Sequence, residues 1–319
     1  MRYQFKPGGG GLTHCSLSPC APSTDVFGGL TMYADFDLKV PDALDDALDA
    51  LASGNSGGAI PLAGGTNVLI DIRARNIDPD SLISVKKIKS LRGITEKDGK
   101  VTVGAATTIS DLLRYPDMPR LGSAIMDAGR VFAGQMVRNA ATVAGNICCG
   151  SPAADTVPPL MVLDAVVTLQ SRSGSREVPL SDFFTGFRTN VRESNELITQ
   201  ISWPVPAKNS ANLYYKIGRR KGDAITVAGV AVSLGIEDGK CKNARIALGS
   251  VAPTVIRATD AEAILEGQAL TAELIDTAAR KAMDASSPID DVRATAEYRR
   301  QQAYVLSRRL VNQAWETLS

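Results

Sequence analysis

Residues 132–155 read FAGQMVRNAATVAGNICCGSPAAD, and the part of this stretch with the smallest side chains is Thr142–Asn146. Small residues let successive backbone N–H groups turn towards one point, so this run can form a cradle for a diphosphate. Asp155, at the end of the stretch, can accept hydrogen bonds from ribose or ribityl hydroxyls. The residues alone support equally well a small-residue loop packed under a helix, with Asp155 as a helix cap.

A second glycine-containing stretch lies upstream, where residues 62–69 read LAGGTNVL after a short apolar segment that predicts a strand. Adjacent glycines after a strand allow a sharp turn and an anion cradle without a cationic side chain, and Thr66 and Asn67 add a hydroxyl and an amide. The stretch is not a P-loop, because the GxxxxGK[ST] lysine is missing, and the GxGxxG pattern is absent. Alone it favours a structural tight turn, whereas two cradles that meet would enclose a diphosphate from both sides.

The composition excludes several classes of function. The 319 residues include 35 Lys plus Arg and 34 Asp plus Glu, so no overall charge draws the chain to nucleic acid or an anionic membrane. His14 is the only histidine, so a Ser-His-Asp or Cys-His site would need it, and a His-rich zinc site cannot form. No metal site is therefore predicted.

Length and apolar content are those of a folded protein with two domains, given about 150 residues per domain and a hydrophobic fraction of 44%. The longest apolar stretch, residues 224–236, is too short to span a bilayer as a helix. Five cysteines, an odd number, do not form a disulfide framework. These features predict a cytoplasmic protein without a transmembrane segment.

Residues 1–31 differ from the remainder, because glycines and prolines recur and no apolar periodicity is present. The segment lacks the apolar core of a signal peptide, and we expect it to be disordered or non-native, with Met32 as the natural start. It contains His14, Cys15 and Cys20. Without a fourth ligand, these three residues favour a tail over a metal site.

Apolar periodicity and turn signals predict the main elements of the body. Residues 41–54 have helical spacing, with Asp42 as the expected N-cap. Thr259 and Glu262 form a capping-box pattern at the start of another helix. The pair Asp238-Gly239 predicts a hairpin. Strands are predicted at residues 60–63, 100–106, 165–171, 197–203, 224–236 and 240–251, and further helices at 109–114, 121–136, 271–285 and 295–316.

From about Met32 to the C-terminus, the chain resembles the FAD-binding subunit or domain of molybdenum hydroxylases, a family that includes the medium subunit of carbon monoxide dehydrogenase and the flavin domain of xanthine dehydrogenase. The residues 132–155 quoted above, paired with the upstream glycine stretch, carry the resemblance. It implies an α+β fold: a two-part FAD-binding domain of the vanillyl-alcohol-oxidase (PCMH) type, followed by a small C-terminal domain of one sheet and helices.

The resemblance also implies a division of the chain. The FAD-binding domain would occupy residues 32–207, with subdomains at about 32–85 and 86–207, and the C-terminal domain residues 212–318. Pro204 and Pro206 mark the clearest linker between them.

FAD-contacting residues follow from the same resemblance. The two stretches would hold the pyrophosphate, Phe132 would be the aromatic contact, Asp155 would bind hydroxyls and Ile198 would be an apolar neighbour of the flavin. Lys216 would lie near the isoalloxazine and tune it, because a positive charge favours a reduced, anionic flavin; Lys216→Ala should then slow flavin reduction while FAD is retained. The full predicted set is Leu62, Ala63, Gly64, Gly65, Thr66, Asn67, Val68, Leu69, Phe132, Thr142, Val143, Ala144, Gly145, Asn146, Asp155, Ile198 and Lys216, with a less certain contact at Asp223.

One position departs from the family pattern, which has two glycines before Asn146 where this chain has Ala144 and Gly145. If position 144 requires a positive φ, alanine there would cost about 1 kcal/mol.

Three other features have ordinary interpretations. Cys148 and Cys149 suggest small apolar filling beside the cofactor, because an iron–sulfur cluster needs about four thiolates and Cys241 is the only other cysteine of the body. The basic pairs Arg299-Arg300 and Arg308-Arg309 predict a solvated helix face or, second, a docking surface for an acidic partner. Trp203 suggests packing between domains, or an aromatic residue near the flavin.

The function implied by the resemblance is that of an electron-transfer flavoprotein subunit. A large subunit with a molybdenum cofactor would oxidise the substrate, a small subunit with two two-iron two-sulfur clusters would relay electrons, and FAD on this chain would pass them to NAD or another acceptor. The resemblance suggests a dimer of such three-subunit units, and the substrate would be chosen by another polypeptide.

Two alternatives remain open on the sequence. One is a stand-alone flavin-dependent oxidase or reductase of the same fold. Many such oxidases tether FAD through histidine, and the body has none, so non-covalent FAD is expected. The other is a binding or scaffold protein in which both cradles are structural.

Overall fold

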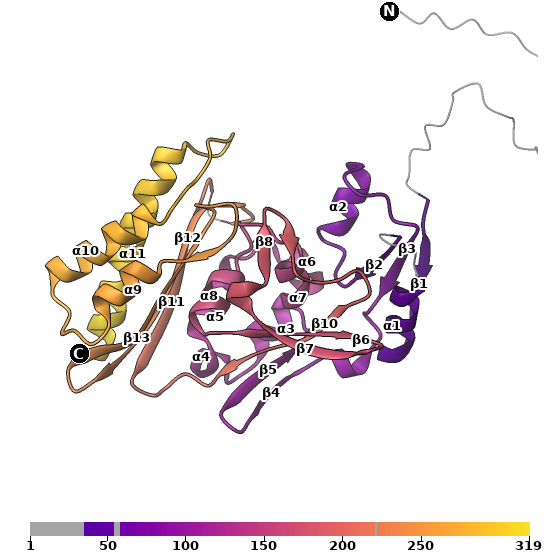
Figure 1. Ribbon diagram of the computed structural model, residues 1–319, viewed down its shortest axis with the longest axis horizontal. Coiled ribbons are helices and arrows are strands. Elements are labelled where there is room, and N and C mark those ends of the chain that lie inside the picture. The colour runs from indigo at the N-terminus through magenta and orange to yellow at the C-terminus, as the bar shows by residue number, and fades with distance from the viewer. Residues whose placement is uncertain (1–34, 54–57, 221) are drawn as a thin grey trace, which may run out of the picture. The chain divides into compact units, whose positions relative to one another are not determined.

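The computed structural model describes residues 35–53, 58–220 and 222–319. The extension expected at residues 1–31, with His14, Cys15 and Cys20, lies outside the described residues. Residues Asp35–Ser319 form one unit by their internal contacts, and three larger sheets and one two-stranded sheet organise its described part (Figure 1).

The first sheet is parallel, with strand order β1-β3-β2. Its strands are β1 (Asp37–Lys39), β2 (Ala59–Leu62) and β3 (Ser81–Ser84), accompanied by helices α1 (Leu44–Ala52) and α2 (Val68–Arg73). Helix α1 buries Ala47, Leu48 and Leu51 against this sheet, as the helical spacing predicts. The predicted cap Asp42 was wrong: α1 begins at Leu44, so the N-cap position is Ala43, without a side-chain hydrogen bond.

The second sheet is antiparallel, with order β4-β5-β10-β6-β7. Its strands are β4 (Ile94–Lys97), β5 (Lys100–Gly104), β6 (Val166–Ser171), β7 (Gly174–Pro179) and β10 (Leu197–Pro204), and a small hairpin, β8 (Phe184–Gly186) with β9 (Thr189–Asn190), follows β7. Short 3-10 turns lie at Lys89–Leu91 and Leu180–Asp182. Trp203 is buried in the core of this part, where its indole N–H donates to the Leu121 carbonyl at 2.8 Å.

Helices α3 to α8 all lie in the connection between β5 and β6 of the second sheet. They are α3 (Ile109–Arg114), α4 (Met118–Leu121), α5 (Ser123–Val131), α6 (Gln135–Ala140), α7 (Val143–Cys148) and α8 (Val157–Val162). The single helix expected over 121–136 is therefore broken. Gly122 separates α4 from α5, and Ala133, with a left-handed φ of 35°, ends the helical run before α6.

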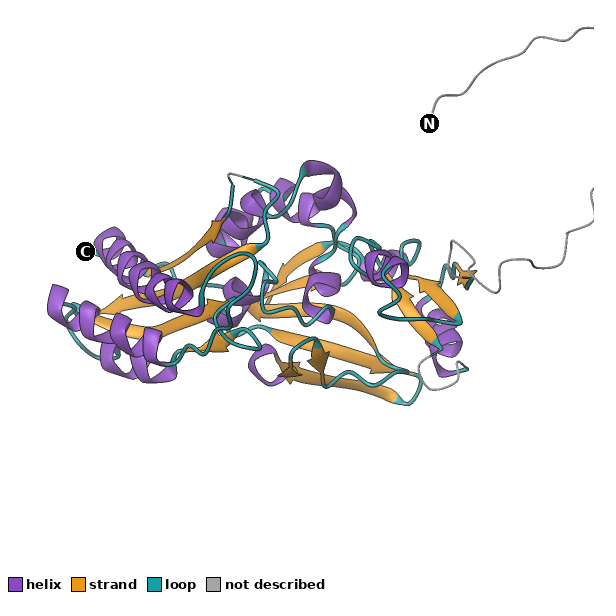
Figure 2. Cartoon of the chain, turned by 90° about the horizontal axis from the view of Figure 1, so that it is seen from above, coloured by secondary structure: helices purple, strands orange, loops and turns teal. Residues whose placement is uncertain are grey.

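The third sheet has the order β11-β12-β13-β14. Its strands are β11 (Ser210–Gly218), β12 (Thr226–Glu237), β13 (Lys240–Gly249) and β14 (Ile256–Arg257), with helices α9 (Thr259–Leu265), α10 (Ala272–Asp284) and α11 (Ala296–Leu318) along one face (Figures 1 and 2). The expected hairpin is present at Asp238 and Gly239, which both have positive φ. Helices α5 and α8 pack against β11 to β13.

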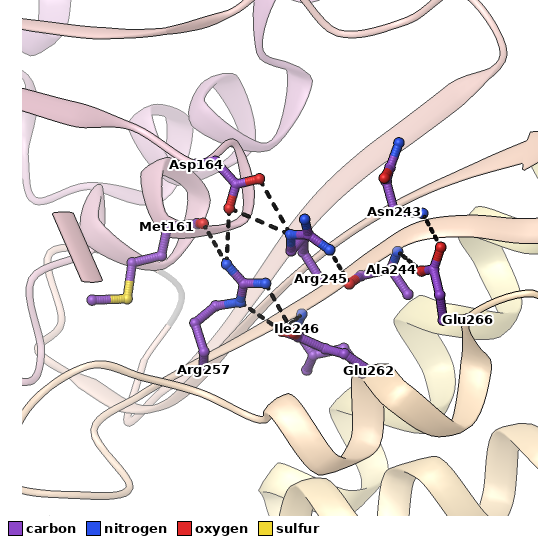
Figure 3. Close-up of polar contacts among 9 residues, drawn as sticks. All are labelled: Met161, Asp164, Asn243, Ala244, Arg245, Ile246, Arg257, Glu262 and Glu266. Atoms are coloured by element: carbon purple, nitrogen blue, oxygen red, sulfur yellow. Dashed lines mark hydrogen bonds and ion pairs between the residues drawn. The ribbon is translucent and has the colours of Figure 1, made fainter. Parts of the chain in front are cut away.

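A cluster of charged residues links α8 to the third sheet (Figure 3). Arg257 donates to Asp164 at 3.0 Å and to both carboxylate oxygens of Glu262 at 2.5 and 2.8 Å, while Arg245 reaches Asp164 at 3.2 Å. The capping box predicted for Thr259 and Glu262 was therefore wrong. Glu262 is directed to Arg257 and accepts the Ile246 amide at 2.8 Å, and the N-cap is Ala258.

The basic pairs on α11 do not all face solvent. Arg299 is buried; it donates to the Val227 carbonyl at 2.7 Å and the Ser250 carbonyl at 3.0 Å, and it pairs with Asp291 at 2.7 Å. A solvated face was therefore the wrong interpretation for this arginine, whereas Arg300, Arg308 and Arg309 are exposed. No helix among the described residues is long and apolar enough to cross a membrane.

Candidate functional site

In chain order, the first stretch is residues 62–69 and the second is Thr142–Asn146. The first stretch connects β2 to α2 and lies directly against Ala140 and Ala141, which lead into the second. A Cβ built on Gly64 would lie 2.0 Å from the Ala140 carbonyl oxygen and 3.0 Å from the Ala141 Cα. Only glycine permits that approach. Gly65 has a φ of 71°, which completes the turn. The backbone at Gly64 is thus in contact with the residues directly before the second stretch.

The second stretch is the first turn of α7 rather than an open loop. Thr142 is the N-cap, and its hydroxyl accepts the Gly145 amide at 3.0 Å. Ala144 is buried within this helix and is not among the residues with positive φ. The strain considered for alanine at this position therefore does not arise.

The asparagines of the two stretches bind within the protein. Asn67 donates one amide proton to Asp71 at 3.0 Å, and the Asn146 side-chain oxygen accepts both the amide and the hydroxyl of Thr156, at 3.2 and 2.7 Å. These side chains hold the two turns in shape.

In the second stretch three backbone amides are also bonded internally: Val143 N–H to the Thr107 carbonyl at 3.3 Å, Gly145 N–H to the Thr142 hydroxyl at 3.0 Å and Asn146 N–H to the Thr142 carbonyl at 3.0 Å. Backbone N–H groups that suit a diphosphate are therefore supplied mainly by the first stretch.

An ion pair that the sequence did not indicate ties the two stretches together. Asp71, on α2, accepts hydrogen bonds from Arg188 through both carboxylate oxygens and from Asn76 at 3.1 Å. Arg188 lies at the turn between β8 and β9 and has a φ of 56°. Its backbone packs closely against Gly150, just after α7, because a Cβ built on Gly150 would lie 2.9 Å from the Arg188 Cα. No local signal could have revealed this pair, because its partners are 117 residues apart.

This pair predicts a pH dependence of stability. The hydrogen bond from Arg188 lowers the pKa of Asp71, partly opposed by burial. A carboxyl whose pKa is lower in the folded state stabilises the fold above the unfolded pKa, and that contribution is lost as the pH falls. We therefore expect the free energy of unfolding of the wild-type protein to decline below about pH 4. Asp71→Asn should lower the free energy of unfolding by about 1 to 2 kcal/mol at pH 7, and its decline at acid pH should be shallower.

Urea unfolding at pH 3 and pH 7 measures this effect. Asp98→Asn, at an exposed left-handed turn position between β4 and β5, is the matched control and should follow the wild-type decline. Equal declines in wild type, Asp71→Asn and Asp98→Asn would contradict the assignment to Asp71.

Asp155 lies at the centre of a buried polar cluster that joins the end of the second stretch to the third sheet. It accepts hydrogen bonds from Lys216 Nζ at 2.6 Å, the Tyr214 hydroxyl at 3.1 Å and the Thr226 hydroxyl at 2.5 Å. Lys216 also donates to the Ala224 carbonyl at 3.1 Å, and its side chain is only 6% exposed. Burial, reinforced by the Asp155 charge, raises the pKa of Tyr214. The structure thus brings the predicted residues Asp155 and Lys216 into one ion pair.

Phe132 and Ile198 are both buried, Phe132 after the end of α5 and Ile198 on β10. The turn after Phe132 is held by Arg138, whose Nη1 donates to the Phe132 and Ala133 carbonyls at 2.8 and 2.6 Å. Arg138 thereby supports the left-handed Ala133, a role that spacing alone did not predict. Gly134 approaches Asp223, with 3.9 Å between its would-be Cβ and the Asp223 carboxyl carbon.

The two neighbouring cysteines near the second stretch are protonated thiols at neutral pH. Burial raises the pKa of Cys148 to about 11 and also raises that of Cys149, which donates to the Asn146 carbonyl at 3.0 Å. Cys241 is buried in the separate core between the third sheet and its helices. Within residues 35–53, 58–220 and 222–319, no group of three or more metal-ligating side chains is found.

Comparison with known proteins agrees with this architecture. Residues 34–206 match the family model for the FAD binding domain in molybdopterin dehydrogenase, and residues 213–314 match the model for the CO dehydrogenase flavoprotein C-terminal domain. The chain therefore belongs to the FAD-binding subunits of the molybdenum hydroxylase family. It is an oxidoreductase subunit, and its cofactor is FAD.

Particular relatives extend this result over most of the chain. It is 32% identical to the carbon monoxide dehydrogenase medium chain of Hydrogenophaga pseudoflava, covering 88% of this chain and 97% of that protein. It is 30% identical to the xanthine dehydrogenase FAD-binding subunit of Escherichia coli O157:H7, covering 85% and 93%. A structure of carbon monoxide dehydrogenase from Hydrogenophaga pseudoflava superposes with a TM-score of 0.85 at 34% identity, covering 88% and 97%. The α+β fold class and the order of FAD-binding and C-terminal domains are confirmed.

Proposed function

We propose that this chain is the electron-transfer subunit of a heteromeric molybdenum hydroxylase, which takes electrons from iron–sulfur clusters of a partner subunit and passes them through FAD to NAD or another acceptor. The observation that carries the proposal is the backbone contact between Gly64 and Ala140. It places the glycine turn after β2 against the segment that leads into α7, so the two stretches proposed to bind one diphosphate lie side by side. We also propose domain limits of 32–207 and 212–318.

The residues proposed to contact FAD are those that these turns and their neighbours supply. Backbone groups of Ala63–Asn67 and Thr142–Asn146 would hold the pyrophosphate, Phe132 and Ile198 would provide apolar contact, and Asp155 with Lys216 would lie beside the ribityl and flavin groups. FAD supplies the redox chemistry when bound, while the protein positions it and tunes its electronics.

The geometry of Lys216 refines its proposed role. Because Asp155 neutralises it at 2.6 Å, the pair acts on its surroundings as a dipole and not as a free positive charge, so its effect on the flavin is smaller than that of an unpaired lysine. Arg138 fixes the position of the Phe132 carbonyl. We propose Arg138 as a positioning residue for the aromatic contact.

Purification of the chain alone and together with its partners tests the proposed function. We expect stoichiometric FAD that acid precipitation releases fully into the supernatant, since none of the described residues is a histidine. The flavin should be reduced by the reduced iron–sulfur partner and not by an organic substrate alone. Direct reduction by a substrate would instead establish a stand-alone oxidase or reductase, and a colourless chain that fails to bind added FAD would establish a scaffold.

A further inference from the structure

The hairpin of β8 and β9 bonds to α2, which follows the first stretch, and to the end of α7, which contains the second. Its base is anchored in the core of the second sheet, where Phe183 is fully buried and its carbonyl accepts the Val191 amide at 3.0 Å. Its tip is the two-residue turn Phe187-Arg188. The tip therefore carries the groups that reach the neighbouring segments.

On one side, the hairpin bonds to the backbone at the end of α7, just beyond the second stretch. The Arg188 amide donates to the Gly150 carbonyl at 3.1 Å, and Asn190 Nδ2 donates to the Cys148 carbonyl at 3.3 Å. Gly150 has a φ of 59° and lacks the side chain that would keep the Arg188 backbone away. The hairpin and the end of α7 are thus joined through their backbones.

On the other side, the Arg188 side chain reaches α2. Its guanidinium donates to both carboxylate oxygens of Asp71, to one of them at 3.1 Å. The same carboxylate accepts the side-chain amides of Asn67 at 3.0 Å and Asn76 at 3.1 Å. Paired hydrogen bonds between a guanidinium and a carboxylate fix direction as well as distance. Asp71 thereby transmits the position of Arg188 to Asn67, within the first stretch.

The backbone conformation of Arg188 indicates that its contacts hold it in place. Its φ of 56° is left-handed, which a residue with a Cβ disfavours. Two-residue hairpin turns usually have glycine, asparagine or aspartate at such positions. A residue stays in a disfavoured conformation only where the surrounding structure determines it, and here the bonds to Asp71 and Gly150 do so. The Asp71 side chain is only 12% exposed, so water screens the pair less than a pair on the surface.

We infer that the β8–β9 hairpin is a clasp that sets the lifetime of bound FAD, with Arg188 as the positioning residue that holds the first stretch beside the second. The inference rests on the proposed function, in which both stretches bind one diphosphate. Release of the diphosphate requires the stretches to part, and the bonds between Arg188 and Asp71 oppose that movement. Loss of these bonds should therefore speed the release of FAD more than it slows binding.

The rate of FAD release from the full FAD-loaded chain, followed by flavin fluorescence after dilution, tests the clasp. Arg188→Met should raise the release rate constant about tenfold and change the association rate constant by less than about twofold. Arg188→Lys keeps the charge without the planar fork, so it should raise the release rate constant about threefold. Asp71→Asn should act in the same direction. The double variant Asp71→Asn/Arg188→Met should release FAD no faster than the faster single variant, because both changes remove the same bonds.

Arg120→Met is the matched control. Arg120 donates to both carboxylate oxygens of Glu96, at 3.2 and 2.5 Å, and so joins α4 to β4 by the same kind of pair outside both stretches. Urea unfolding of the FAD-free chains gives the general loss of stability in each variant, and Arg120→Met should release FAD as wild type does. Equal acceleration by Arg120→Met and Arg188→Met would overturn the clasp. So would wild-type release by both Arg188→Met and Arg188→Lys.

The variant Gly64→Ala separates this inference from the proposed function. Loss of FAD affinity in Gly64→Ala, together with wild-type release by the Arg188 variants, would reject the clasp alone. Full FAD affinity in Gly64→Ala would reject the shared diphosphate site and the clasp with it, because the clasp acts by holding those two stretches together.

Discussion

Replacement of Gly64 by alanine is expected to lower the affinity for FAD by about a hundredfold or more, because the added Cβ would lie 2.0 Å from the Ala140 carbonyl oxygen. The opposing atom is backbone, so no side-chain rotation relieves the overlap. Overpacking of this kind commonly costs about 1 to 3 kcal/mol even against side chains. The two stretches must separate, and the diphosphate site that we propose between the two turns would then be lost.

FAD content after purification and titration of the apoprotein with FAD measure this effect. Gly235→Ala on β12 is the matched control, because its added Cβ would approach other atoms only to 3.4 Å, an ordinary contact. It should retain FAD as wild type does. Full FAD affinity in Gly64→Ala would show that the contact between the stretches does not hold the cofactor.

Removal of the charge of Lys216 is expected to destabilise the fold by about 3 kcal/mol and to slow flavin reduction, because it leaves Asp155 buried without its cation. Lys216→Met keeps most of the side-chain length. Asp155→Leu should be similarly destabilising, since among the described residues it leaves the ammonium group with the Ala224 carbonyl as its remaining partner. Because each single change strands one charge, the double variant should be more stable than the sum of the two losses predicts.

Urea unfolding of the four proteins gives the coupling energy, and rapid mixing with the reduced partner gives the rate of flavin reduction. We expect Lys216→Met to retain FAD and to be reduced about tenfold more slowly, equivalent to about 1.4 kcal/mol in the barrier. Additive stability effects would show that the ion pair does not join the second stretch to the third sheet. An unchanged reduction rate in an otherwise folded variant would remove Lys216 from flavin tuning.

The fold elements were predicted best where a local pattern was sufficient. The Asp238-Gly239 turn is present, and the helices expected over 271–285 and 295–316 are observed at Ala272–Asp284 and Ala296–Leu318, because turn chemistry and helical spacing act over a few residues. The helix expected over 121–136 was broken at Gly122 and at Ala133, where Arg138 holds the turn from five and six residues away through the Ala133 and Phe132 carbonyls. The short parallel strands β1 and β3 were not predicted from local pattern, since they pair only with residues far along the chain.

The sequence by itself identified the family, the two stretches of small residues and the set of candidate FAD contacts. These depend only on residue type and order. Tertiary structure decided which of those residues meet. It placed Gly64 against Ala140 and paired Asp155 with Lys216 and Asp71 with Arg188. The physical reason is the same in each case: close approach and charge pairing depend on distances between segments far apart in sequence, which no local pattern encodes.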